Sequence, residues 1–183
     1  MQYYIDIRVL KNPEIPSQVL LNMLFEKMHL ILAEQKRTDV GVSFPEISKT
    51  LGDVLRLHGG KEALESVAAH RFFNAMRDYA QVGRIMEVPA GAGSGNVARV
   101  QAKSNVERLR RRRMKRHGIS EEQAVNEIPD TAAETLNLPF ISLHSRSTGQ
   151  KFRLYVSQKM CAESRNGEFS AYGLSGSATV PIF

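Results

Sequence analysis

The 183-residue sequence contains no tryptophan and a single cysteine, Cys161. One cysteine excludes an internal disulfide bond and a cysteine-based zinc site, and it fits a protein of the reducing cytoplasm. Aromatic residues make up only 7% of the chain, which argues against a broad aromatic platform for stacking bases. No apolar run approaches the ~18 residues that a membrane span needs, so we expect no membrane partner.

Metal-binding patterns are missing as well. No two of the five histidines (His29, His58, His70, His117 and His144) have the spacing that places two ligands on one helix face. Acidic residues do not cluster as two-metal nucleases require. We therefore expect no metal and no cofactor. If the protein cleaves nucleic acid, the simplest route uses the RNA 2′-hydroxyl as nucleophile and a side-chain base, which restricts the substrate to RNA.

Acidic residues are nearly absent from one stretch, residues 103–117, which holds eight Lys or Arg residues and one acid, Glu107. The remainder of the chain has 17 basic and 18 acidic side chains, so this stretch alone accounts for the net charge of +6. Such a concentration of guanidinium groups is typical of an element that lies along nucleic-acid phosphates. Charge alone does not distinguish RNA from DNA.

Capping signals predict that the basic stretch is one helix. Ser104-Asn-Val-Glu107 has the pattern of a capping box, and Gly118 stands where a left-handed C-cap belongs. The opposite, apolar face of this helix is interrupted by Arg110 and Arg113. One helical face is expected to carry Arg108, Arg111, Arg112, Lys115 and, at its margin, Arg116.

Hydrophobic periodicity predicts an α+β fold. We expect strands near residues 3–10, 40–44, 54–58 and 85–88, a helix from an N-cap at Ser17 to about residue 35, and helical structure over 61–79, with a break near His70. This order is the split βαβ, ferredoxin-like pattern. The apolar stripe of the first helix leaves His29 just outside it. In the second half of the chain we expect strands near residues 97–102, 140–143, 152–156 and 168–172, and a short helix from Ser120.

The predicted organisation is a ferredoxin-like domain over residues 1–89, a glycine-rich linker or hairpin over 90–96, and a C-terminal α/β segment over 97–183 that carries the basic helix. Residues 145–152 are rich in hydroxyl groups, which suits either an ordinary hairpin turn or a loop that holds a phosphate or sugar. The same two interpretations apply to Tyr172-Gly-Leu-Ser175.

A series of short motifs runs through nearly the whole chain. The motifs are Tyr4-x-Asp6-Ile7-Arg8, Gly41-Val-Ser-Phe-Pro45, Arg99-Val-Gln101-Ala-Lys-Ser-Asn105, the arginine-rich helix with Arg116-His117, Ile128-Pro-Asp-Thr131, Leu138-Pro-Phe140, Ser145-x-Ser-Thr-Gly-Gln-x-Phe152-Arg153, Tyr172-Gly-Leu-Ser175 and Pro181-x-Phe183. In this order and at these separations, they resemble the type I-F CRISPR-associated endoribonucleases of the Csy system.

The resemblance implies a metal-independent endoribonuclease that cleaves precursor CRISPR RNA at the repeat stem-loop. Attack of the 2′-oxygen on the adjacent phosphate would leave a 2′,3′-cyclic phosphate and a 5′-hydroxyl. By the same resemblance, His29 is the catalytic histidine, Ser145 holds the 2′-hydroxyl, and Tyr172 orients the imidazole. The implied RNA-binding residues are Arg99, Gln101, Arg108, Arg111, Arg112, Lys115, Arg116, His117, Ser147, Thr148 and Phe152.

Among these, Arg99 and Gln101 correspond to readers of base edges in the lower stem, and Phe152 to the aromatic ring that stacks under the terminal base pair. The resemblance further implies that the protein stays bound to the mature guide RNA and joins the other subunits of a type I-F surveillance complex. Two alternatives stay open: a non-catalytic subunit that binds the RNA hairpin, and a regulator whose basic helix binds B-DNA.

Overall fold

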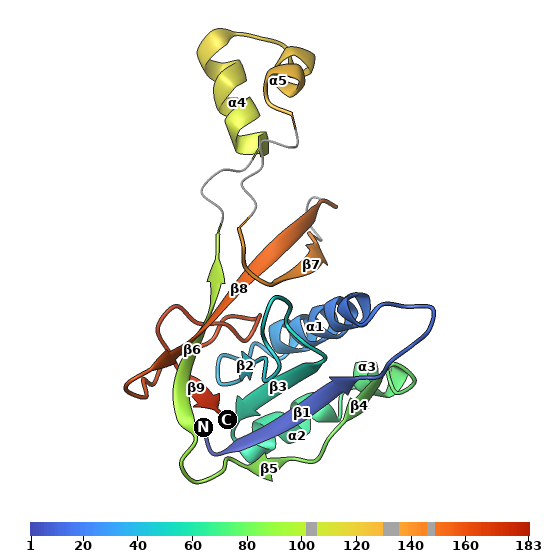
Figure 1. Cartoon of the computed structure of the whole chain (residues 1–183), viewed down its shortest axis with the longest axis vertical. Coiled ribbons are helices and arrows are strands. Elements are labelled where there is room, and N and C mark those ends of the chain that lie inside the picture. Colours follow the sequence, from blue (N-terminus) through green and yellow to red (C-terminus); the bar gives the residue numbers. More distant parts are fainter. Residues whose placement is uncertain (102–105, 130–135, 146–148) are drawn as a thin grey trace. The chain divides into compact units, whose positions relative to one another are not determined.

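The structure, a computed structural model, describes residues 1–101, 106–129, 136–145 and 149–183 (Figure 1). Two compact units are present: Met1–Val100 together with Leu138–Phe183, and Gln101–Asn137. The first unit therefore extends across the predicted boundary at residues 90–96. Its described residues form two antiparallel sheets and three helices, which confirms the predicted α+β class. None of the helices in the described ranges is long and apolar enough to cross a membrane.

The N-terminal sheet has the strand order of a ferredoxin-like domain, β2-β3-β1-β4, and each neighbouring pair is antiparallel. A short strand, β5, pairs with the start of β1. The strands are β1 (Tyr3–Val9), β2 (Gly41–Ser43), β3 (Val54–Gly59), β4 (Ala80–Val82) and β5 (Met86–Glu87). The helices are α1 (Ser17–Glu34), α2 (Lys61–Ala68) and α3 (Arg71–Ala75), and both α1 and α2 contact β1 and β3.

Helix α1 carries the candidate catalytic histidine and is anchored by an apolar side. Its buried residues recur at helical spacing: Leu20, Leu21, Leu24, Phe25, Met28, Ile31 and Leu32. The predicted N-cap at Ser17 is wrong. Ser17 is the first helical residue, and Pro16 is the N-cap, because the Pro16 carbonyl already accepts hydrogen bonds from the amides of Val19 and Leu20.

The predicted helical stretch over 61–79 consists of two helices, with the expected break near His70. The His70 ring caps α3, since its Nδ1 accepts a hydrogen bond from the amide of Phe72 at 3.3 Å. The chain then returns to the sheet twice, as β4 and as β5, where only one strand over 85–88 was predicted.

The second sheet has the order β7-β8-β6-β9 and lies in the same compact unit. Its strands are β6 (Gly93–Val100), β7 (Phe140–His144), β8 (Lys151–Cys161) and β9 (Val180–Ile182). Buried residues of both sheets, such as Val42 and Leu57 in the first and Val97 and Leu154 in the second, form one continuous core. The candidate site is therefore built within a single compact unit.

Two sequence-based expectations differ from this sheet. Residues 93–96 belong to β6 rather than to a linker, and Gly95 pairs with both Met160 and Val180. A Cβ atom at Gly95 would lie 2.5 Å from the Ile182 side chain, so glycine serves close packing there instead of flexibility. The strand predicted at 168–172 is wrong: this segment is irregular and is attached by single backbone bonds, such as that from Phe169 to Thr38.

The described residues of the second compact unit form a pair of helices, α4 (Val106–His117) and α5 (Glu121–Glu127). The predicted C-cap is confirmed, because Gly118 has a φ of +64° and its amide donates to the Met114 carbonyl. Ser104 of the predicted capping box lies outside the described residues. Helix α5 begins with a complete capping box, formed by Ser120 and Gln123.

Candidate active site and nucleic-acid interface

The His29 imidazole is held in a defined orientation by a distant part of the chain. Its Nδ1 lies 2.9 Å from the Ala171 carbonyl oxygen. Because a carbonyl oxygen only accepts, this contact places a proton on Nδ1 and leaves Nε2 as the lone-pair nitrogen of the neutral ring. The Tyr172 ring stacks on the imidazole, with centroids 3.9 Å apart and an interplanar angle of 12°.

A tight turn positions both of these contacts. The amide of Gly173 donates to the Ser170 carbonyl, and the Gly173 carbonyl accepts from the amide of Val42 in β2. Gly173 has a φ of +68°, and a Cβ atom there would lie 2.5 Å from Cγ1 of Val42. Only glycine fits this backbone position without displacing the turn. Helix α1 and this turn together therefore determine where the imidazole points.

The imidazole lines a cavity of about 330 Å³. The residues around it come from α1, β7, β8 and the turn: Glu26, His29, Leu30, Leu143, His144, Ser145, Phe152 and Tyr172. The structure thus brings together all three predicted catalytic residues and the predicted stacking ring. Ser145 follows β7 directly, and its backbone is bonded to both Gly149 and Gln150. Ser147 and Thr148 lie outside the described residues.

The two predicted base readers, Arg99 and Gln101, lie in different compact units. Arg99 lies near the end of β6, is exposed, and places its guanidinium 5.8 Å from the centroid of the Phe152 ring. A cation at this distance from an aromatic face is favourable and orients the arginine beside the cavity. Gln101 is exposed and belongs to the other compact unit. Of the two predicted base readers, Arg99 is thus the one that lies beside a residue of the cavity.

Helix α4 separates its basic residues into two groups. Arg110 and Arg113, which interrupt the apolar face, are bonded to α5: Arg110 donates to the Ile128 carbonyl at 2.8 Å, and Arg113 pairs with Glu127 at 2.7 Å. His117 contacts Arg113 at 3.1 Å. Within the described part of the chain, no hydrogen bond, ion pair or ring contact involves Arg111, Arg112, Lys115 or Arg116, which are all exposed.

This exposed basic group has the chemistry that a nucleic-acid interface requires. Guanidinium and ammonium groups without an acidic partner attract phosphates, because only an anion from outside the protein can balance their positive charge. Arg108 belongs to the same predicted face and is also exposed. The remaining two arginines stabilise the helical pair instead. The distinction between exposed arginines and arginines bonded to α5 could not be made from composition.

Two polar residues of the cavity, Glu26 and His144, were not among the predicted site residues. Glu26 precedes His29 by three positions, and residues at this spacing are neighbours on a helix surface. The spacing was therefore a usable signal for a carboxylate beside the histidine. His144 precedes Ser145 in the chain, and its participation depends on where β7 ends.

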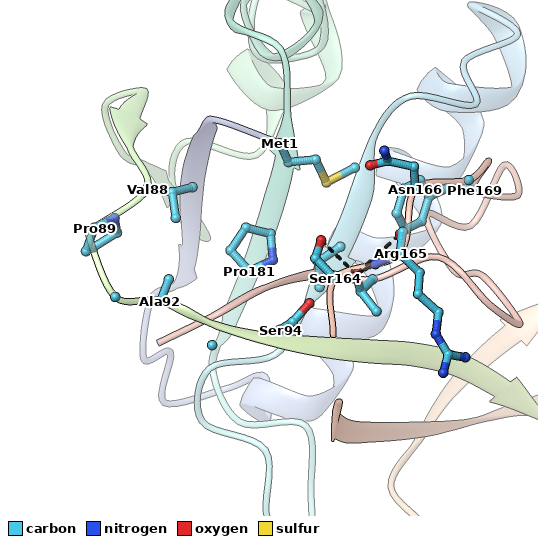
Figure 2. A pocket seen from close by; sticks show the side chains of 15 residues that line it. Met1, Val88, Pro89, Ala92, Ser94, Ser164, Arg165, Asn166, Phe169 and Pro181 are labelled. Atoms are coloured by element: carbon cyan, nitrogen blue, oxygen red, sulfur yellow. Dashed lines mark hydrogen bonds between the residues drawn. The ribbon is translucent and has the colours of Figure 1, made fainter. Parts of the chain in front are cut away.

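A second cavity, of about 270 Å³, lies beside the N-terminus, the connection from β5 to β6, and residues 164–167 (Figure 2). Arg165 is the one ionisable side chain among its described lining residues, and its amide is bonded to Thr179 at 2.8 Å. No predicted site residue lines this cavity. Among the described residues, no group of three or more His, Cys, Asp or Glu side chains is placed to hold a metal ion.

Comparison with known proteins identifies the family of the chain. A family described as "CRISPR-associated protein (Cas_Csy4)" matches residues 4–183. A protein named CRISPR-associated endonuclease Cas6/Csy4 from Pseudomonas aeruginosa (strain UCBPP-PA14) is 43% identical over 187 residues, and both chains are covered completely. A protein of the same name from Escherichia coli (strain UTI89 / UPEC) is 40% identical over 184 residues, again with complete coverage. The chain therefore belongs to the Cas_Csy4 family of CRISPR-associated proteins.

Proposed function

We propose that this protein is an endoribonuclease that cleaves precursor CRISPR RNA at the repeat stem-loop, without a metal, and then retains the product. The endonuclease names of its full-length relatives support the general activity. The observation that carries the proposal is the arrangement of His29: a ring held by Ala171 and Tyr172, in one cavity with Ser145 and Phe152. The metal-free route is also part of the proposal and goes beyond what these names state.

His29 acts as the general base. The Ala171 carbonyl holds the tautomer whose Nε2 can accept a proton, and stacking on Tyr172 limits rotation of the ring. Nε2 takes the proton of the 2′-hydroxyl, the 2′-oxygen forms a bond to phosphorus, and the bond from phosphorus to the 5′-oxygen breaks. The products are a 2′,3′-cyclic phosphate and a 5′-hydroxyl, whose proton comes from water or from the imidazolium.

The remaining groups of the cavity position the RNA. The Ser145 hydroxyl holds the 2′-hydroxyl, and Phe152 stacks on the closing base pair of the stem while Arg99 contacts a base edge. Positioning matters because a reactant held near the attack geometry avoids the entropy cost of finding it. The exposed residues of α4, with Arg108, bind the phosphates of the hairpin.

Retention of the product follows from the same division of roles. Cleavage at the cavity leaves the phosphates of the hairpin unchanged, so the contacts of α4 persist after the reaction. A hairpin bound in this way can serve as the attachment of this protein to other subunits of a type I-F complex. The hairpin is therefore part of the substrate before cleavage and the bound partner after it.

The test is cleavage of a repeat hairpin RNA in EDTA by wild-type protein and by His29→Ala, with binding measured in parallel. We expect wild type to cleave without added metal, and His29→Ala to cleave about 10²–10⁴-fold more slowly with a similar Kd. Tyr172→Phe should retain most activity because it keeps the stacked ring, whereas Tyr172→Leu should lose activity.

Dependence on Mg²⁺ would contradict the metal-free mechanism. Tight binding of the hairpin without any cleavage would instead identify a non-catalytic RNA-binding subunit. Preference for a matched DNA duplex over the RNA hairpin at the same salt concentration would contradict both, and it would favour a DNA-binding regulator.

A further inference from the structure

Helix α1 presents one polar side to the second sheet. Gln18 and Asn22 lie on this side and hydrogen-bond to the main chain of β7, at 3.4 and 3.2 Å. Glu26 and His29 continue the same stripe, because they follow Asn22 at intervals of four and three residues. The polar stripe thus leads from a structural junction into the catalytic cavity, where Glu26 is part of the wall.

The Glu26 carboxylate has no polar partner among the described residues. It is half-buried, and across the described ranges it makes no hydrogen bond, ion pair or ring contact. A negative charge beside a scissile phosphodiester is unfavourable, because it repels the phosphate that the site must hold. A carboxylate in this place is compatible with RNA only if it faces groups that donate hydrogen bonds.

Few groups of the RNA near the cut can donate. With the cut placed directly after the closing base pair that stacks on Phe152, the Watson–Crick edge of the nucleotide before the scissile phosphate is already paired. The 2′-hydroxyl of that nucleotide is engaged by Ser145 and His29. The remaining donors lie on the unpaired nucleotide that follows the scissile phosphate: its 2′-hydroxyl, which is the same in all four nucleotides, and its base. Cytosine, adenine and guanine offer an exocyclic amine, whereas uracil offers carbonyl oxygens on both sides of its single N–H.

We propose that Glu26 is a specificity-determining residue that accepts a hydrogen bond from the exocyclic amine of the base immediately after the cut. This inference rests on the proposed function and adds a base preference to it. Uracil at that position would place a carbonyl oxygen against the carboxylate, so cleavage before uracil is disfavoured. The residue contacts the leaving side of the substrate and takes no part in proton transfer.

The experiment uses four repeat hairpin RNAs that differ only in the nucleotide after the cut: C, A, G or U. Single-turnover cleavage rates are measured in EDTA, with protein in excess, for wild type, Glu26→Ala and Glu26→Gln. Glu34→Gln, a change at a carboxylate of the same helix outside the cavity, is the matched control. Single-turnover rates are needed because a retained product would mask differences in the cleavage step.

We expect wild type and the control to cleave the C, A and G substrates about 10-fold faster than the U substrate. In Glu26→Ala and in Glu26→Gln, whose amide can donate to a carbonyl as well as accept, the four rates should lie within about 3-fold of one another. Equal wild-type rates, or a wild-type ranking that persists in Glu26→Ala, would overturn the inference. So would a change in all four rates by one factor, which signifies a charge effect alone.

These outcomes are separate from a failure of the proposed function. If wild type cleaves none of the four RNAs, the endoribonuclease assignment fails, and the inference fails with it. If wild type cleaves all four at rates that do not depend on Glu26, only the inference fails.

Discussion

A buried histidine in the sheet that supports α1 gives a quantitative prediction. His58 is fully buried in β3, and its Nε2 lies 2.8 Å from the Ser43 hydroxyl, while its Nδ1 has no hydrogen-bond partner among the described residues. Burial, followed by the positive charges of Arg56 and of the N-terminal amine, lowers the pKa of His58 to about 3. The folded protein therefore keeps this ring neutral throughout the physiological range.

Acid should destabilise the protein through this residue. An unfolded chain protonates a histidine near its ordinary pKa of 6.5, whereas the folded chain accepts that proton only near pH 3. Below pH 6.5 the unfolded state thus binds more protons, and the free energy of unfolding falls by about 1.4 kcal/mol per pH unit. The loss is about 2 kcal/mol at pH 5 and approaches about 5 kcal/mol near pH 3.

The assay is urea unfolding of wild type and His58→Gln between pH 8 and pH 5. The glutamine can still bond to Ser43 but does not titrate, so other titrating groups cancel in the difference between the two proteins. Above pH 7 the difference in unfolding free energy should be constant. From pH 6.5 to pH 5 it should shrink by about 2 kcal/mol. Parallel stability curves over this range would refute the buried, neutral state of His58.

Two further predictions concern the turn and the basic helix. Gly173→Ala should slow cleavage at least 10-fold and lower the free energy of unfolding by about 1–3 kcal/mol, because the residue needs a positive φ and its Cβ would collide with Val42. Gly176→Ala is the control, because a Cβ there meets nothing within 4 Å. Equal effects of the two substitutions would contradict the role of the turn. Arg112→Gln should reduce the slope of log Kd against the logarithm of salt concentration by about 0.7–0.9. Arg113→Gln, a change at an arginine paired with α5, should leave that slope unchanged. Equal slope changes would refute this separation of roles.

The sequence was most informative where the pattern is local. The apolar period of α1 placed His29 just off the buried side, and Gly118 ended the basic helix where the structure ends it. The order of strands and helices sufficed for the ferredoxin-like strand order, because such connections are short and follow a limited set of topologies. The position of His29 off the buried side and the end of the basic helix depend on residues within one or two turns of each other.

Features that depend on distant partners were not accessible from the sequence. Residues 90–96 suggested flexibility, but β6 already begins at Gly93, since β8 and β9 pair with it. The three-residue strand β9 contains Pro181 and has no alternating pattern, so nothing marked it as a strand. The contact between His29 and Ala171 joins residues 142 positions apart, and it determines the tautomer on which the mechanism depends.

The central claim is that His29 activates a ribose 2′-hydroxyl of a bound RNA hairpin. The most direct measurement compares two repeat hairpins in EDTA, one fully ribose and one with a single 2′-deoxy nucleotide before the cut. The account predicts that the ribose hairpin yields a 2′,3′-cyclic phosphate and a 5′-hydroxyl, and that the deoxy hairpin binds equally well but stays intact. Cleavage of the deoxy hairpin, or a product with a 5′-phosphate, would contradict it.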